Sequence, residues 1–368
     1  MPEWVNGDGP GVCELMVVGE ALGKDEEFQG RPFVGPSGRL LNEMLKVAGS
    51  SREEVYVTNV VKVRPPDNKL ARLHELGYKI DDFLPTLWKE INVINPNCIL
   101  AVGKTALKYL TGHDKISNYR GSILSSVVGY PKIVPTIHPA ALFERGVKEG
   151  GLGSSPWKQK VFIQFDIKRA VDQSKFKEFR LPVRDLHVCK NSLDLHRFLT
   201  RHENYKYMAV DVETYKAIPL CIGLAFTKSE AISCPLFNIM SPTNLTGIAR
   251  HEVIEVWRIL ANILWDEKVR KVGQNYKFDQ LILENNGMPT RGFHADTMAM
   301  FSTLYPELPK KLQFISSIFT EEPYYKDEGK EFNPKKDSYD RLYLYNAKDA
   351  AVELECFEEM DIELSEVS

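Results

Sequence analysis

The stretch YMAVDVETY, residues 207–215, sets two carboxylates at the end of an apolar strand. Its first four residues suit a buried sheet, whereas Asp211 and Glu213 follow two positions apart. Side chains alternate between the two faces of a strand, so both carboxylates point to the same side, roughly 7 Å apart. Like charges this close repel each other and resist removal from water. The stretch therefore predicts a buried strand whose acids need a compensating positive charge.

Two segments further along the chain add carboxylates of the same kind. In residues 271–289, Asn275 and Asp279 are four positions apart, on one face of a helix that ends at Gly287. The last helix has one charged residue, Asp349, on its apolar stripe. The members of that stripe are Leu342, Tyr345, Asp349, Val352 and Cys356. A lone carboxylate facing a core is strongly unfavourable unless it is paired or binds a metal.

Together these acids predict a metal site on Asp211, Glu213, Asp279 and Asp349. Oxygen ligands suit hard cations such as Mg²⁺ or Mn²⁺, and two ions about 3.5–4 Å apart can clamp a phosphodiester. Tyr345, one turn before Asp349, could position the attacking water. Taken singly, each residue has a simpler interpretation as a loop cap, a helix cap or a core side chain. The order DxE, NxxxFD, YxxxD favours the metal site.

Residues 183–368 resemble the 3′–5′ proofreading exonuclease domain of family A DNA polymerases, of the DEDD type with a tyrosine. The matching segments are DVET, NYKFD and YNAKD, with HADTM (294–298) and ISCPL (232–236). The resemblance implies a ribonuclease H-like fold, two divalent ions on the four carboxylates, and Tyr345 assisting the water. It also implies that Asn275 and Phe278 help to hold the DNA strand terminus, and that Asp296 supports the ligands without being one.

The first half of the chain alternates short apolar strands with helices. Strands are predicted at 13–20, 54–61, 97–103 and 132–139, and helices at 37–49, 84–96 and 104–112. This alternation is typical of a mostly parallel sheet covered on both faces. In the second half, strand 207–213 has a predicted antiparallel partner at 220–226. Because 368 residues exceed one ordinary core, we expect two α/β domains, 1–175 and 183–368, joined by a linker at 176–182.

Residues 17–45 form a glycine-rich turn between a strand and a helix, which can present backbone N–H groups to an anion. Its spacing matches neither a dinucleotide fingerprint nor a P-loop. Asn59 and His138 follow two other strands, at the edge where open α/β sheets bind ligands. Asparagine can read a base edge, histidine can donate to a developing anion, and Phe33 offers a stacking surface. Singly, these residues also suit a cap, a turn or a core.

Residues 13–172 resemble the uracil-DNA glycosylase superfamily, and family 4 in particular. The matching segments are GEALG, GRPFVG, TNVVKVRPPDN and HPAAL. The resemblance implies a parallel-sheet sandwich that flips a base out of the DNA stack. Phe33 would stack on the uracil, Asn59 would bond its pairing edge, and His138 would stabilise negative charge on the leaving base.

The same resemblance gives roles to the loops around this pocket. Glu20 and the backbone of Gly19–Gly23 would place the water or the scissile sugar. The HPAALFER loop would enter the DNA and bring Arg145 near a phosphate. Leu22 stands where the family has a proline, a change that reshapes the turn around Glu20.

The chain departs from family 4 at the cysteines that hold that family's iron–sulfur cluster. Val63 stands at one ligand position and Phe83 at another, and Cys13 is too near the first strand to supply the N-terminal pair. We therefore expect apolar packing in place of a cluster. The six cysteines are scattered without metal-ligand spacing, which indicates reduced thiols in a cytoplasm-like compartment, a host's cytoplasm if the protein is viral.

The two halves together resemble the front part of some bacteriophage replicative DNA polymerases. Residues 1–175 carry 23 basic and 20 acidic side chains, and residues 176–368 carry 24 and 30, so any contact with nucleic acid must be local or metal-assisted. We expect a nuclease acting on single-stranded or frayed 3′ DNA ends, with uracil excision by the first domain, as part of or beside a polymerase. The alternative is a first domain that only binds DNA or docks a protein. No apolar run approaches the ~20 residues of a membrane span.

Overall fold

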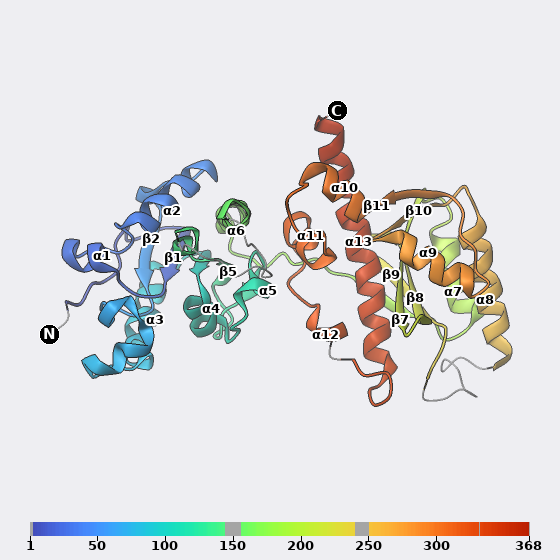
Figure 1. The fold of residues 1–368 in the computed structure, drawn as a ribbon, viewed down its shortest axis with the longest axis horizontal. Helices are drawn as coiled ribbons and strands as arrows, with labels where there is room; N and C mark the ends of the chain where they lie inside the picture. Colours follow the sequence, from blue (N-terminus) through green and yellow to red (C-terminus); the bar gives the residue numbers. More distant parts are fainter. Residues whose placement is uncertain (1–2, 144–155, 240–249, 331, 368) are drawn as a thin grey trace. The chain divides into compact units, whose positions relative to one another are not determined.

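The computed structural model describes residues 3–143, 156–239, 250–330 and 332–367 (Figure 1). The chain divides into two compact units, Met1–Leu181 and Pro182–Ser368. Each unit has its own sheet and its own core.

The first unit is built on a five-stranded sheet with the order β2-β1-β3-β5-β4. Its strands are β1 (Leu15–Gly19), β2 (Tyr56–Asn59), β3 (Cys98–Val102), β4 (Leu124–Ser125) and β5 (Lys132–Thr136). All neighbours pair in parallel except β4, which runs antiparallel at one edge. Every residue of β1, β3 and β5 is buried, as expected for parallel strands covered on both faces.

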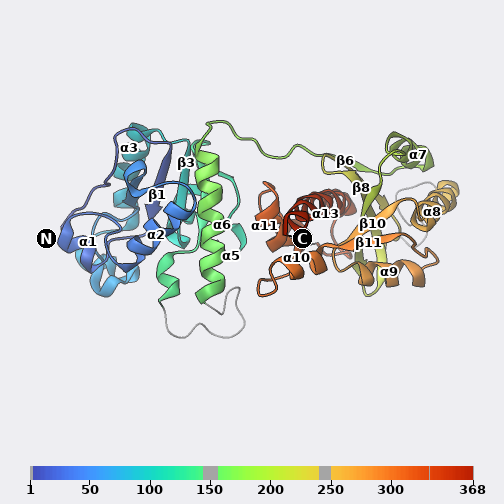
Figure 2. The ribbon, with the colours of Figure 1, turned by 90° about the horizontal axis from the view of Figure 1, so that it is seen from above.

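Helices cover both faces of this sheet. The α-helices are α1 (Lys24–Gln29), α2 (Pro36–Val47), α3 (Leu84–Ile94), α4 (Lys104–Thr111), α5 (Ile116–Tyr119) and α6 (Pro156–Ser174). The 3₁₀ turns are η1 (Arg52–Glu54), η2 (Pro66–Asn68), η3 (Leu70–Leu76), η4 (Ile80–Phe83) and η5 (Pro139–Leu142). Helices α2 and α6 share one apolar core with the strands, and α3 and α4 share the other. Figure 2 shows α6 running beside the strands.

The second unit contains a six-stranded mixed sheet with the order β11-β10-β7-β8-β9-β6. Its strands are β6 (Asp185–Val188), β7 (Tyr207–Tyr215), β8 (Ile218–Thr227), β9 (Glu230–Pro235), β10 (Arg270–Gly273) and β11 (Phe293–Asp296). Strands β7, β8 and β9 form an antiparallel meander, which confirms the predicted partner of β7. Strands β10 and β6 pair in parallel with the two edges of the meander, and β11 pairs in parallel with β10.

One long helix, α13 (Tyr339–Val367), lies against one face of the meander, and α7 (Ser192–Arg201) and α8 (Arg250–Trp265) lie on the other (Figures 1 and 2). The remaining helices are α9 (Tyr276–Asn285), α10 (Thr297–Leu304), α11 (Leu312–Phe319) and α12 (Asp327–Lys330). Among the helices that the structure describes, none has the length and apolar character to cross a membrane.

Small side chains let α13 approach the sheet closely. Ala347, Ala350 and Ala351 of the helix pack with alanines of β7, β8 and β9. At Gly223 of β8, a Cβ atom would lie 2.7 Å from the backbone oxygen of Asn346. The absence of a side chain at Gly223 therefore lets α13 lie directly against β8.

Replacing Gly38 by alanine should destabilise the first unit. A Cβ atom there would lie 1.8 Å from the backbone oxygen of Phe33, so the loop before α2 must move. We expect a loss of about 1–3 kcal/mol in the free energy of unfolding, measured in urea. Gly11→Ala is the control, since nothing lies within 4 Å of its Cβ position. Equal stability of the two variants would contradict the close contact.

Candidate functional site

The structure gathers the four predicted carboxylates beside the second half of β7. Asp211, Glu213 and Asp349 each place a ligand atom within 4.8 Å of the other two. Asp279 lies in the first turn of α9, buried at 6% exposure, and the charges of Asp211 and Glu213 act on it. Three elements that are distant in sequence therefore contribute to one acidic site.

Burial shifts the ionisation of these acids upward. It raises the pKa of Asp211 to about 7, of Glu213 to about 8 and of Asp279 to about 9, and neighbouring carboxylates add to each shift. Lys326 opposes the shift at Asp211 and Glu213. An array that disfavours its own negative charge is a ready site for hard divalent cations.

Asn346 of α13 connects the helix to the sheet at this point. Its amide nitrogen donates to the carboxylate of Asp211 at 2.7 Å and to the backbone oxygen of Asp211 at 3.1 Å. Its amide oxygen accepts from the hydroxyl of Ser233 at 2.7 Å. Sequence reasoning missed Asn346, although it stands inside the YNAKD segment between Tyr345 and Asp349.

Asp296 supports the site from behind through backbone contacts. Its carboxylate accepts from the backbone N–H groups of Asn275 and Tyr276 at 3.0 Å and of Met298 at 2.9 Å. These bonds fix the start of α9, where Asn275 has a left-handed backbone and makes no side-chain cap bond. Asn275 and Phe278 are both exposed beside the buried Asp279.

Three side chains converge on Asp349, and two of them escaped sequence analysis. Tyr325 donates to Oδ1 of Asp349 at 2.5 Å, and Lys326 donates to Oδ2. The ammonium of Lys326 also donates to the hydroxyl oxygen of Tyr345 at 3.2 Å. Burial and the charge of Asp349 hold the pKa of Tyr345 far above its usual value, so its phenol keeps its proton.

In the first unit, the predicted pocket residues meet at the carboxyl ends of the strands. A Cβ atom on Gly19 would lie 2.4 Å from Oδ1 of Asn59 and 2.5 Å from the Phe33 ring, so both side chains crowd the same glycine. The rings of Phe33 and His138 lie nearly parallel, with centroids 6.1 Å apart. His138 also packs against Gly103 at the end of β3. These residues form one cluster of polar and aromatic side chains.

Hydrogen bonds orient His138 and Glu20. Nδ1 of His138 accepts from the backbone N–H of Ala140 at 3.1 Å, so the neutral ring carries its hydrogen on Nε2. Burial lowers the pKa of His138, which keeps the ring neutral near pH 7. Glu20 accepts a hydrogen bond from the hydroxyl of Thr105, in the first turn of α4, and this bond orients the carboxylate.

A hydrogen bond stabilises the glycine-rich turn beside these residues. The carboxylate of Glu26, next to Gly23, accepts from the backbone N–H of Gly35 at 2.9 Å. Arg145, predicted to lie near a DNA phosphate, falls outside the described residues.

The positions that would hold an iron–sulfur cluster in family 4 are apolar. Val63 and Phe83 are buried in the same apolar core, and the ring of Trp4 stacks on Phe83 at 5.2 Å between centroids. Of the two cysteines in this half of the sequence, Cys98 is buried in the core on the other face of the sheet, and Cys13 lies just before β1. These residues do not fit a cluster.

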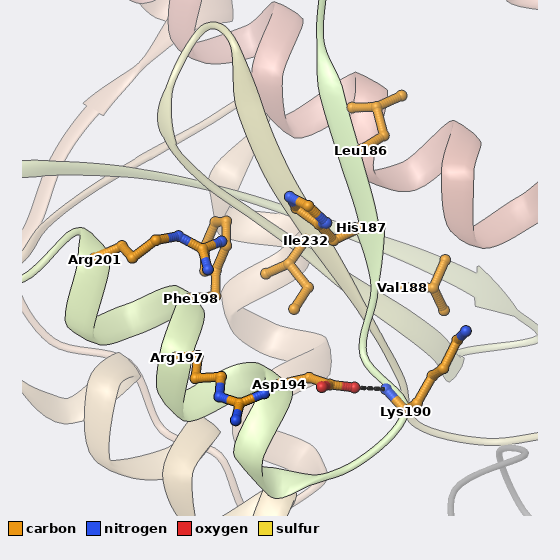
Figure 3. A pocket seen from close by; sticks show the side chains of 9 residues that line it. All are labelled: Leu186, His187, Val188, Lys190, Asp194, Arg197, Phe198, Arg201 and Ile232. Carbon is orange, nitrogen blue, oxygen red and sulfur yellow. Dashed lines mark hydrogen bonds between the residues drawn. The ribbon is translucent and has the colours of Figure 1, made fainter.

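A surface pocket of about 520 Å³ lies between β6 and α7 (Figure 3). It is lined by Leu186, His187, Val188, Lys190, Asp194, Arg197, Phe198, Arg201 and Ile232, and it shares no residue with the acidic site. The nearby acids Asp185 and Glu230 are within ligand distance of His187. Glu230 is already paired with Arg201 and with two histidines, so an ion-pair network accounts for this group.

Each unit matches a family of known proteins. The model of the uracil-DNA glycosylase superfamily matches residues 7–164, and that of a 3′–5′ exonuclease family matches residues 186–365. A type-4 uracil-DNA glycosylase of Thermotoga maritima is 39% identical over 147 residues, which cover 39% of this chain and 74% of that protein. A DNA polymerase of Bacillus phage SP01 is 30% identical over 145 residues, or 39% of this chain and 15% of the polymerase.

Among solved structures, the exonuclease domain of Nibbler from Aedes aegypti matches with a TM-score of 0.39 and 14% identity, over 52% of this chain and 93% of that one. The two family matches and the two α/β sheets confirm the predicted fold class, a glycosylase-like sandwich followed by a ribonuclease H-like domain.

Without metal, the second unit should become less stable as pH rises from about 5 to about 9. Because the folded pKa values of Asp211, Glu213 and Asp279 lie near 7, 8 and 9, above the unfolded values near 4, the native state binds more protons in this window, and stability falls as pH rises through them. Thermal unfolding in EDTA at several pH values measures how stability depends on pH. With Mn²⁺ in place of EDTA, this dependence should be weaker.

The control for this prediction carries Asp211→Asn and Glu213→Gln together, which removes two of the titrating groups. Its melting temperature in EDTA should depend less on pH than that of the wild type. An identical pH dependence in the two proteins would show that these carboxyls do not control the stability of the unit.

Proposed function

We propose that this chain, which belongs to the uracil-DNA glycosylase superfamily through residues 7–164, digests single-stranded or frayed DNA from the 3′ end with its second unit. Residues 186–365 of that unit match a 3′–5′ exonuclease family. The convergence of four acids from β7, α9 and α13 carries this proposal. Asp211, Glu213, Asp279 and Asp349 would hold two Mg²⁺ or Mn²⁺ ions. When bound, such ions activate water and stabilise charge on the scissile phosphate.

The chain's own residues set the geometry of this hydrolysis. Tyr345 keeps its proton and stands one helical turn from Asp349, so its hydroxyl can orient the attacking water. Asn275 and Phe278 are exposed beside Asp279 and can contact the last nucleotide, Phe278 by stacking on its base. The 3′-terminal phosphodiester bond breaks and releases one nucleotide.

In the first unit, we propose a pocket that excises uracil. Phe33 stacks on the flipped base, and the amide of Asn59 bonds its pairing edge. The N-glycosidic bond breaks, and the Nε2–H group of neutral His138 stabilises the negative charge that develops on the leaving uracil. Glu20 and the backbone from Gly19 to Gly23 place the water or the sugar.

The alternative is a first unit that binds DNA without cutting it. Leu22, at the family's proline position, is buried at 3% exposure beside Glu20, and the Glu20 carboxylate is already bonded to Thr105. Uracil excision ahead of replication would also leave abasic sites.

With a phage DNA polymerase among the relatives, we propose that the chain acts as part of or beside a polymerase, in the cytoplasm of the cell that contains it.

Replacing Asp211 by alanine should abolish digestion from the 3′ end. Loss of groups that merely support metal ligands costs 10–100-fold, so loss of a ligand should cost more than about 100-fold. The assay is Mg²⁺-dependent release of nucleotides from a 3′-labelled single strand. Asp361→Asn, an exposed acid of α13, is the control and should keep full activity. Persistent digestion by D211A would refute the site.

Uracil excision can be tested with the exonuclease silenced. A single-stranded oligonucleotide containing one uracil is incubated with the D211A variant in EDTA and then treated with alkali. We expect cleavage at the uracil, loss of that cleavage when Asn59→Ala is added, and no cleavage of a matched thymine oligonucleotide. An intact strand that still binds the protein would favour the non-catalytic alternative.

A further inference from the structure

We propose that Lys326 is a positioning residue of the exonuclease, which holds Asp349 and Tyr345 in their working orientations together with Tyr325. The inference deepens the proposed exonuclease function and rests on it. It starts from an ammonium group that lies within the acidic site, on a segment outside the three metal-ligand motifs.

Two donors from neighbouring residues hold the carboxylate of Asp349. Its side chain is 4% exposed and that of Lys326 is 11% exposed. Tyr325 donates to one carboxylate oxygen and Lys326 to the other. Each carboxylate oxygen has two lone pairs, so one donor on each fixes the rotation of the group and leaves a second lone pair for a cation.

Lys326 also determines how Tyr345 uses its hydroxyl group. An ammonium can only donate, so the Tyr345 oxygen accepts from Lys326 at 3.2 Å. The single hydrogen of the phenol then remains for Asp349 or for a water beside it. Removing the ammonium would free the hydroxyl to rotate, and the tyrosine would lose its preferred direction of donation.

The segment that carries Lys326 is packed tightly against the catalytic tyrosine. The ring of Tyr325 is 5.9 Å from the ring of Tyr345, and Tyr325 is buried at 7% exposure. At Gly329 of α12, a Cβ atom would lie 2.5 Å from the Tyr345 ring. Tyr345 is therefore held between the backbone of α12 and the side chains that precede it.

The charge of Lys326 has a use of its own. Four carboxylates and two divalent ions cancel, and the scissile phosphodiester adds one negative charge. The ammonium of Lys326 supplies the matching positive charge within the buried site. Groups that support metal ligands in this way typically change metal affinity or activity 10–100-fold when removed.

The test compares Lys326→Met with Lys348→Met. Both lysines lie over the ring of Tyr325, at 5.1 and 4.8 Å, and Lys348 pairs with the carboxylate of Glu322 at 3.9 Å. Without DNA, we expect K326M to bind Mn²⁺ about 10-fold more weakly, as measured by electron paramagnetic resonance. We also expect its kcat to fall 10–100-fold while KM for DNA stays unchanged.

The other variants separate charge from packing. K348M should match the wild type, and Lys326→Arg should recover part of kcat. Tyr325→Phe should weaken Mn²⁺ binding although all charges are retained.

Thermal unfolding in EDTA identifies any variant that fails to fold. If K326M fails to fold, Tyr325→Phe is tested in its place. Wild-type Mn²⁺ affinity and kcat in both K326M and Y325F would overturn the inference. Tighter Mn²⁺ binding by K326M would also overturn it, because the lysine would then compete with the ion. A wild-type protein that binds Mn²⁺ but digests no DNA refutes the proposed exonuclease, while the Mn²⁺ affinities still decide the role of Lys326 toward Asp349. A wild-type protein that binds no Mn²⁺ overturns both.

Discussion

The second unit depends on the close approach of α13 to β7 and β8, because that contact forces buried acids together. The alanines at 347, 350 and 351 and the bare backbone of Gly223 let the helix lie close against the sheet. Asp349 and Asp211 then share a site that neither element could form alone. The repulsion between them is a cost that the alanine core must offset, and it is also the source of affinity for cations.

The acids could be predicted from sequence because each breaks a local pattern. Asp211 and Glu213 interrupt an apolar strand, and Asp349 interrupts an apolar stripe. The residues that hydrogen-bond to these acids break no such pattern. Asn346 is one of several polar residues on its helix, and Tyr325 and Lys326 occupy an irregular segment whose approach to Asp349 depends on tertiary packing. Residues that act by pairing across distant segments carry no periodic signal.

The fold shows the same division between local and non-local information. The strands β1, β2, β3 and β5 lie within the ranges predicted for the first half, and each is somewhat shorter than its predicted range. They could be predicted because continuous apolar runs of this kind suit a parallel sheet that is covered on both faces. The outer strands of the second unit, β6, β10 and β11, were not predicted. Each has four residues, and β10 includes Arg270 and Lys271, so pairing with a neighbour rather than composition makes them strands.

The apolar core around Val63, Phe83 and Trp4 also bears on how the first unit reaches its native state. A domain closed by aromatic and aliphatic side chains needs no iron or sulfide delivered by a cell's assembly machinery. Its folding should therefore not depend on the iron supply. Oxidants that dismantle iron–sulfur centres would find no such centre at these apolar positions, so this region should tolerate aerobic growth and purification in air.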